Sequence, residues 1–165
     1  MLTRPIHSTG EAMPVIGVGT YRTFDIGNDA AALEQRIKVL ETLFKAGGSM
    51  IDSSPMYDSA EANVGRALGK MGARKKAFLA TKVWTNGEQT GIREMQRSAR
   101  LIGATGDKMT LDLMQIHNLV DWRTQMKTMR AWKERGRFRY IGITHYTSSA
   151  LDDLAKVIEA EKIDF

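Results

Sequence analysis

The sequence predicts an α/β protein built on a parallel β-sheet, and three observations support that prediction. Short apolar segments alternate along the chain with longer segments in which apolar residues recur at helical spacing. Successive strand signals are separated by enough residues for one helix, which is the pattern of repeated βα units. Glycines and helix-capping residue types lie at the boundaries between these segments. Two architectures fit this pattern, a doubly wound open sheet and a (β/α)8 barrel.

The first part of the chain is expected to form a hairpin and then a strand. Residues 3–7 and 12–16 are joined by a short segment containing Gly10, which is typical of a β-hairpin. The apolar residues of 15–20 predict the first strand of the sheet.

The first helix is expected to begin after Asp29, a residue type that caps helix N-termini, and to end at Lys45. The apolar residues that share one face at helical spacing are Leu33, Ile37, Leu40 and Phe44. Gly47 and Gly48 follow directly and are expected to stop the helix.

The same alternation predicts the remaining elements. Further strands are expected at residues 49–53, 77–83, 111–117 and 139–144. Further helices are expected at residues 60–71, 90–102, 123–135 and 148–161. Met126 and Met129 are expected on the inner face of their helix, which Gly136 ends. Residues 163–165 have the character of the start of another strand.

Residues 1–165 are expected to form a single but incomplete domain. A (β/α)8 barrel takes about 250 residues, and after the hairpin the chain carries six strand signals, the last one cut short. Bare parallel edge strands invite aggregation. We therefore expect a fragment of a longer chain that is inactive by itself, and the alternative is an open sheet that is complete as it stands.

Composition narrows the class of protein. The absence of cysteine excludes a disulfide scaffold, thiolate metal sites and a cysteine nucleophile. The sequence shows neither a signal peptide nor an apolar run approaching the roughly 18 residues of a membrane span, so we expect a cytoplasmic protein with no membrane partner. The net charge of +5 is dispersed among acidic residues, and we expect no nucleic-acid partner. No pattern in the sequence indicates an oligomeric state.

Polar residues follow several of the predicted strands, and in parallel sheets functional residues gather at those ends. Lys82 closes an apolar strand, where a partly buried ammonium requires a counter-charge such as Asp52 on the neighbouring strand. An ammonium beside Tyr57 would lower the pKa of that phenol and make it a workable general acid. His117 could orient a carbonyl oxygen or share the proton.

Each of these residues also has a structural interpretation. Lys82 alone could extend along the surface into solvent, and Asp52 alone could form a turn or cap the next helix. Tyr57 alone could be a packing residue, and His117 alone a hydrogen-bonded core residue. Their convergence at the ends of successive strands favours the catalytic interpretation.

Other site types receive less support. Asp52, His117 and His145 could provide metal ligands, but the chain lacks the His-x-His pair of metal-dependent barrel hydrolases, and we expect no metal. No GxxxxGK[ST] loop occurs, and the GxGxxG pattern that Gly17 and Gly19 begin fails because position 22 is Arg.

At these residues the chain resembles the aldo-keto reductase family. The segments that carry the resemblance are residues 13–21, 47–57 continuing through Glu61 to 64–68, 81–84, 113–117 and 139–144. The resemblance implies a (β/α)8 barrel, truncated here after about six strands, with the N-terminal hairpin capping the barrel bottom. It also implies reversible hydride transfer between NADP(H) and a small-molecule aldehyde or ketone.

The resemblance also implies residue roles. Tyr57 would be the general acid, Lys82 paired with Asp52 would tune it, and His117 would help to place the carbonyl. The residues expected near the cofactor are Gly19, Thr20, Tyr21, Asp52, Thr144 and His145. The residues expected to line the substrate pocket are Tyr21, Trp84 and His117.

Two departures from the family pattern bear on function. Thr144 and His145 stand where the family commonly carries Ser-Asn to hold the nicotinamide carboxamide. The family's grip on the adenosine phosphate lies in the last third of the barrel, beyond these residues, so NAD(H) is not excluded as the cofactor. An alternative function is that of the cofactor-sensing accessory barrels of membrane channels, and a third is a metal-dependent hydrolase.

Overall fold

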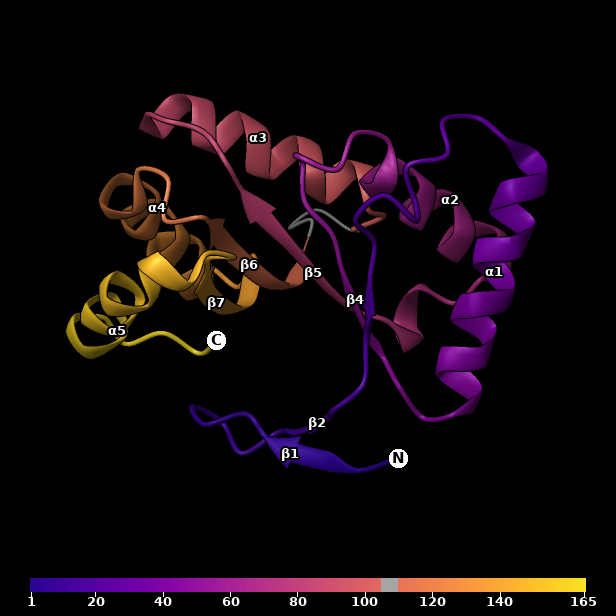
Figure 1. Cartoon of the computed structure of the whole chain (residues 1–165), viewed down its shortest axis with the longest axis horizontal. Helices are drawn as coiled ribbons and strands as arrows, with labels where there is room; N and C mark the ends of the chain where they lie inside the picture. Colours follow the sequence, from indigo (N-terminus) through magenta and orange to yellow (C-terminus); the bar gives the residue numbers. More distant parts are fainter. Residues whose placement is uncertain (105–109) are drawn as a thin grey trace.

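The computed structural model describes residues 1–104 and 110–165, in which five α-helices curve around a parallel sheet (Figure 1). The strands are β1 (Thr3–Pro5), β2 (Ala12–Pro14), β3 (Val18–Gly19), β4 (Met50–Asp52), β5 (Phe78–Val83), β6 (Leu111–His117) and β7 (Phe138–Thr144). The helices are α1 (Ala30–Lys45), α2 (Ala60–Met71), α3 (Glu88–Leu101), α4 (Trp122–Glu134) and α5 (Leu151–Ala160). Two short 3-10 helices lie at Arg74–Lys76 and Ser148–Ala150.

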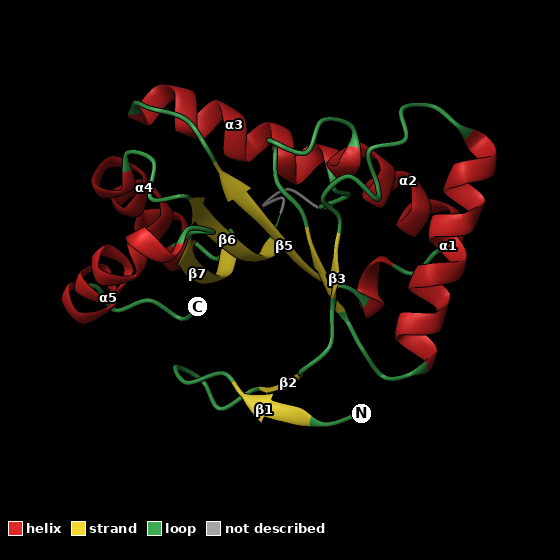
Figure 2. Ribbon diagram, in the orientation of Figure 1, coloured by secondary structure: helices red, strands yellow, loops and turns green. Residues whose placement is uncertain are grey.

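The order of the strands distinguishes between the two predicted architectures. The parallel sheet runs β3-β4-β5-β6-β7, so each strand pairs with its predecessor in the sequence. A doubly wound sheet reverses its strand order at a switch point, whereas a barrel keeps consecutive order. Helices α1 to α5 follow one another along the same side of the sheet (Figure 2). The arrangement is that of a partial (β/α)8 barrel, as expected from the resemblance.

Apolar residues fill both sides of the curved sheet. The larger core packs the helices against the outer face and includes Leu40, Ile51 and Met129, all 0% exposed. Burying one such side chain contributes about 1.5–3 kcal/mol. A second cluster on the inner face contains Ile6 of the hairpin together with residues of β5, β6 and β7. The β1–β2 hairpin therefore covers the lower end of the sheet interior, as predicted.

Helix α1 has the predicted bounds, and its ends show the expected chemistry. The Asp29 carboxylate accepts a hydrogen bond of 2.9 Å from the Ala32 N–H and caps the helix. Gly47, with φ +86°, takes the left-handed conformation that follows many helix ends. Leu43 rather than Phe44 completes the buried face, and Phe44 is half-buried against the same core.

Several predicted bounds were wrong. The strand expected at 15–20 is reduced to β3, and Val15 and Ile16 are 42% and 57% exposed. Only β4 pairs with β3 among the described residues, and an edge strand with a single neighbour has little to hold its ends. The hairpin strands are shorter than predicted, α3 begins two residues earlier, and the helix expected at 148–161 is a 3-10 turn followed by α5.

Residues 163–165 lie beside β7 without forming a regular strand. The Asp164 N–H donates to the Ile141 carbonyl at 2.9 Å, and the Ile143 N–H donates to the Phe165 carbonyl at 3.2 Å. A Cβ at Gly142 would lie 2.6 Å from the Phe165 carbonyl oxygen. The bare glycine therefore lets this segment approach β7, in the place where the sequence predicts the start of a strand.

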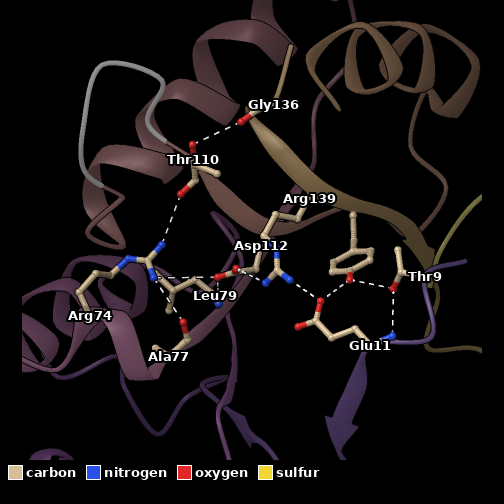
Figure 3. A network of polar contacts seen from close by, with 10 residues as sticks. Thr9, Glu11, Arg74, Ala77, Leu79, Thr110, Asp112, Gly136 and Arg139 are labelled. Atoms are coloured by element: carbon tan, nitrogen blue, oxygen red, sulfur yellow. Dashed lines mark hydrogen bonds and ion pairs between the residues drawn. The ribbon is translucent and has the colours of Figure 1, made fainter. Parts of the chain in front are cut away.

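A polar network fastens the hairpin to the lower end of the sheet (Figure 3). Arg139 contacts both the Glu11 carboxylate and Asp112, the latter at 2.9 Å. Asp112 also accepts a 2.8 Å hydrogen bond from the Leu79 N–H. The Tyr140 hydroxyl donates to Glu11 at 2.5 Å. We call this set the basal network.

Candidate active site

The four residues expected to be catalytic meet at the upper end of the sheet, where the parallel strands finish. Asp52 is the last residue of β4, Lys82 lies near the end of β5, and His117 ends β6. Tyr57 follows β4 in the loop before α2. Three neighbouring strands thus supply an acid, an ammonium and an imidazole to one place because their register brings their ends together.

Lys82 and Asp52 form the expected ion pair. The Lys82 Nζ lies 2.6 Å from the Asp52 Oδ2 and 2.7 Å from the Ser53 carbonyl oxygen. The Lys82 side chain is only 5% exposed, so the ammonium depends on these partners. The other carboxylate oxygen of Asp52 accepts a 3.0 Å hydrogen bond from the Gln115 amide. Both oxygens of Asp52 are therefore held in a fixed orientation.

The Tyr57 ring packs among the other site residues. Its centroid lies 5.1 Å from the Lys82 Nζ and 5.9 Å from the His117 ring, which it meets edge-on. Burial raises the pKa of Tyr57, and the negative charge of Asp52 and the neighbouring Tyr21 raise it further. The expectation that the pKa of Tyr57 is lowered overall was wrong, because the raising effects exceed any lowering by the Lys82 ammonium. Asp52 balances the ammonium at close range, and burial penalises the phenolate.

His117 is buried and neutral. Its Nδ1 lies 2.9 Å from the Ser54 hydroxyl, and the residue is 6% exposed. Burial, with smaller electrostatic contributions from Lys82 and the neighbouring His145, lowers the pKa of His117 to about 4. At neutral pH the imidazole therefore carries one proton and no charge.

A pocket of about 480 Å³ opens in front of the Tyr57 and His117 side chains. This volume lies within the range of about 300–1,000 Å³ that is usual for small-molecule sites. Its lining residues are Tyr21, Met56, Tyr57, Trp84, His117, Asn118 and Tyr146. The expected pocket residues Tyr21, Trp84 and His117 are all among them. The wall is mainly aromatic, which suits a small organic ligand.

The residues expected near the cofactor occupy different environments. Gly19 is exposed at the end of β3, and a Cβ added to it would meet no atom within 4 Å. Thr20 is 0% exposed, and its hydroxyl lies 3.0 Å from the Asp52 carbonyl oxygen and 2.9 Å from the Ser53 hydroxyl. The side chain of Thr20 thus fastens β3 to the Asp52 segment and does not face the pocket.

Thr144 is the last residue of β7, and His145 follows it directly. Thr144 is the sheet partner of His117, and its side chain is half-buried. The His145 Nδ1 lies within 3.1–3.2 Å of the N–H groups of Tyr146 and Thr147 and of the Thr147 hydroxyl. Backbone N–H groups only donate, so Nδ1 is an acceptor and the ring proton lies on Nε2.

Sequence reasoning assigned no role to three of the residues that shape the site. Gln115 fixes Asp52, Ser54 fixes His117, and Asn118 adds an amide to the pocket wall. Gln115 could have been found, since it lies two residues before His117 and alternate residues of a strand share a face. Ser54 and Asn118 lie in loops, where such a signal is lacking.

Other site types gain no support from the described residues. Within residues 1–104 and 110–165, no three His, Asp or Glu side chains cluster as a metal site. Among the helices described, none combines the length and the apolar character needed to cross a bilayer.

Comparison with known proteins places the chain in a family. The family model described as "Aldo/keto reductase family" matches residues 15–165, which is most of the chain. The chain belongs to the aldo/keto reductase family. Solved members of the family are (β/α)8 barrels, in agreement with the consecutive strand order.

Individual relatives show the extent of the similarity. An aldo-keto reductase of Mycolicibacterium vanbaalenii is 32% identical over 151 residues, covering 86% of this chain and 49% of the relative. The methylglyoxal reductase YeaE of Escherichia coli is 27% identical over 159 residues, covering 93% of this chain and 54% of the relative. The chain therefore spans about half the length of these curated relatives.

A solved structure gives the same result. The aldo/keto reductase of Klebsiella pneumoniae, in complex with NADP and acetate, superposes with a TM-score of 0.70 at 26% identity. The match covers 89% of this chain and 51% of that structure.

Proposed function

We propose that this chain forms the reaction centre of an NAD(P)H-dependent reductase that converts a small aldehyde or ketone to an alcohol. The observation that carries the proposal is the ion pair of buried Lys82 and half-buried Asp52 against the Tyr57 ring, which lines an aromatic pocket together with His117. Carbonyl reduction needs a proton donor and a group that orients the oxygen. Tyr57 and His117 offer those two functions at one pocket wall.

Tyr57 is the proposed proton donor. Its raised pKa keeps the phenol protonated at neutral pH, which is the state that donation to a carbonyl oxygen requires. The same raised pKa makes Tyr57 a poor base for the reverse reaction until the pH is high. Alcohol oxidation is therefore expected to rise with pH through the alkaline range, while reduction changes little around neutrality.

His117 is proposed to orient the carbonyl oxygen. The Ser54 hydroxyl accepts from the Met56 N–H at 3.2 Å and lies 2.9 Å from the His117 Nδ1. In the proposed tautomer, Ser54 donates to Nδ1 and the proton of the ring lies on Nε2. A neutral imidazole then donates a hydrogen bond into the pocket without adding a charge.

Lys82 is proposed to act on Tyr57 through its charge and its remaining N–H. Asp52 and the Ser53 carbonyl occupy two of the three ammonium donors. The third is available to stabilise the phenolate that forms as Tyr57 releases its proton. Gln115 supports this geometry from a distance by holding Asp52.

The residues at the end of β7 suit the amide end of a nicotinamide. A carboxamide has one acceptor oxygen and an NH₂ donor, and it pairs with a mixed set of donors and acceptors. His145 presents a fixed Nε2–H donor, and Thr144 presents a hydroxyl that can accept or donate. We propose that these two residues replace the Ser-Asn pair of the family, with Gly19 and Tyr21 bordering the ring. When bound, the cofactor supplies the hydride.

NADP(H) is the proposed cofactor and a small carbonyl compound the proposed substrate. The 26% identical Klebsiella pneumoniae structure is a complex with NADP. The relative YeaE is named as a methylglyoxal reductase, which favours a short, reactive aldehyde as the first substrate to try.

The test of the proposal joins residues 1–165 to the remaining part of a relative's barrel, which lies outside the region that the two chains share. Residues 1–165 are assayed with NADPH and methylglyoxal, both alone and fused to the C-terminal part of YeaE. We expect the fusion to oxidise NADPH only when the aldehyde is present, and the 165 residues alone to show no turnover. A fusion that binds NADPH but turns over no aldehyde would support an accessory, cofactor-binding function instead.

A further inference from the structure

The segment 84–87, which we call the Trp84 loop, carries one wall of the pocket between β5 and α3. Its main-chain groups are held by side chains of α3 and of the segment just before α4. The Trp84 N–H donates to the Glu94 carboxylate of α3. The Gly87 N–H donates to the Asp121 carboxylate at 2.8 Å, just before α4 begins. Two carboxylates from different parts of the chain thus fix the two ends of this loop.

Gln125 of α4 also holds the Trp84 loop. Its side chain is 0% exposed, and its Nε2 lies 3.1 Å from the Thr85 carbonyl oxygen and 3.3 Å from that of Gly87. A Cβ added at Gly91 of α3 would lie only 2.0 Å from the Gln125 Oε1. The glycine therefore provides the space in which Gln125 lies between α3 and α4.

Asp121 belongs to a second loop, residues 118–121, which follows directly after His117. Asn118, Leu119 and Asp121 all have positive φ, at 55°, 55° and 44°. Such conformations are unfavourable for residues with a Cβ and persist where the surroundings enforce them. The Asp121 contact with Gly87 joins this strained loop directly to the Trp84 loop.

We propose that Asp121 and Gln125 are positioning residues that hold the Trp84 ring beside His117 in the pocket wall, and hence set the size of carbonyl compound that the pocket accepts. The proposal rests on the proposed function, because it treats this pocket as the substrate site. The ring centroids of Trp84 and His117 lie 6.3 Å apart, and Trp84 follows β5 whereas His117 is the last residue of β6. The Asp121–Gly87 hydrogen bond links the two loops directly. Trp84 is 41% exposed, so packing alone does not fix it.

The test compares Asp121→Gly with Asp121→Asn. Glycine tolerates the left-handed backbone and removes the carboxylate, whereas asparagine also tolerates that backbone and keeps an acceptor for Gly87. Gly91→Ala is the second disrupting variant, since it displaces Gln125 without touching Asp121. The rate of amide hydrogen exchange at Gly87 measures how well the Trp84 loop is held. Binding of benzaldehyde and 2-naphthaldehyde, followed by NMR at the Trp84 indole N–H, reports the pocket.

We expect Asp121→Gly and Gly91→Ala to speed Gly87 exchange by about tenfold or more. Both are expected to reduce the preference for benzaldehyde over 2-naphthaldehyde several-fold, while Asp121→Asn stays near the wild type. An unchanged preference in both disrupting variants would overturn the proposal, as would a wild type that does not distinguish the two aldehydes. These readouts need no turnover, so an inactive fusion protein would count against the proposed function alone.

Discussion

The two ends of the sheet place similar residues in different surroundings. At the lower end, Tyr140 is 2% exposed, and its hydroxyl donates to Glu11 and lies 3.0 Å from the Thr9 hydroxyl. At the upper end, Tyr57 packs against the ammonium of the Lys82–Asp52 ion pair, and its ring borders an open pocket. Burial raises the pKa of both phenols. The comparison shows that a shifted pKa does not by itself mark a catalytic tyrosine. What distinguishes Tyr57, and supports its proposed role, is that its side chain lines an open pocket.

The ion pairs at the two ends also differ in whether they lie beside a pocket. In the basal network the carboxylates of Glu11 and Asp112 contact Arg139, so the network connects the hairpin to the sheet. At the upper end, the Lys82–Asp52 pair is surrounded by groups that hold it in place and leaves Tyr57 and His117 facing the pocket. The lower end is expected to govern stability, and the upper end chemistry.

A large effect on turnover is expected when Lys82 is replaced. Lys82→Met in the YeaE fusion should lower the rate by about 100-fold or more, because the phenolate of Tyr57 loses its cationic neighbour. The 165-residue chain carrying this change should also lose about 2 kcal/mol of unfolding free energy, since Asp52 remains half-buried without its counter-charge. Urea denaturation measures the second effect.

A double variant separates the two roles of this pair. Adding Asp52→Asn to Lys82→Met should restore most of the stability and none of the turnover. If the double variant regained turnover, the ion pair would be structural, like the basal network.

The basal network should show the opposite response. Asp112→Ala removes the partner of the Leu79 N–H and of Arg139, and should cost about 2–3 kcal/mol of unfolding free energy. Asp112→Asn keeps one acceptor and should cost less. Aldehyde binding at the pocket, measured at a temperature where both variants are folded, should stay at the wild-type level. Weakened binding in the folded variants would show that the two ends are coupled.

A smaller effect is expected from His117 as the pH falls. The pKa of His117 is about 4 in the folded chain and near 6.5 when unfolded, so the unfolded chain binds the proton first. Stability is therefore lost as the pH falls from about 6.5 toward 4. Between pH 7 and pH 5 the wild type should lose about 1–2 kcal/mol more than His117→Gln. Parallel pH profiles for the two proteins would contradict the buried, neutral state of His117.

Much of the fold could be predicted because local and long-range signals agree. Helix α1 has a capping Asp29, a regular apolar face and a glycine stop, and its bounds were correct. Strand β3 was overestimated because the apolar character of Val15 and Ile16 does not reveal that few partners cover them. Strand order could not be read from periodicity, since both candidate architectures have the same alternation of elements.

The site was predictable in its strand residues and less so in its loops. Asp52, Lys82 and His117 follow from the rule that functional residues gather at strand ends. The predicted direction of the pKa shift at Tyr57 was wrong. The shift depends on burial and on how fully Asp52 balances the charge of Lys82, and only the coordinates show these. The contacts of Asp121 and Gln125 join residues more than thirty positions apart, and no local pattern indicates them.

The most direct test of the account compares Tyr57→Phe with Tyr140→Phe in the same fusion protein. Each change removes one hydroxyl from a phenol with a raised pKa, one at each end of the sheet. We expect Tyr57→Phe to lower NADPH-dependent aldehyde reduction by about 10²–10⁴-fold while NADPH binding is kept. Tyr140→Phe should keep turnover and cost about 1 kcal/mol of stability. Retained turnover in Tyr57→Phe, or an equal loss in both variants, would contradict the assignment of Tyr57 as the proton donor.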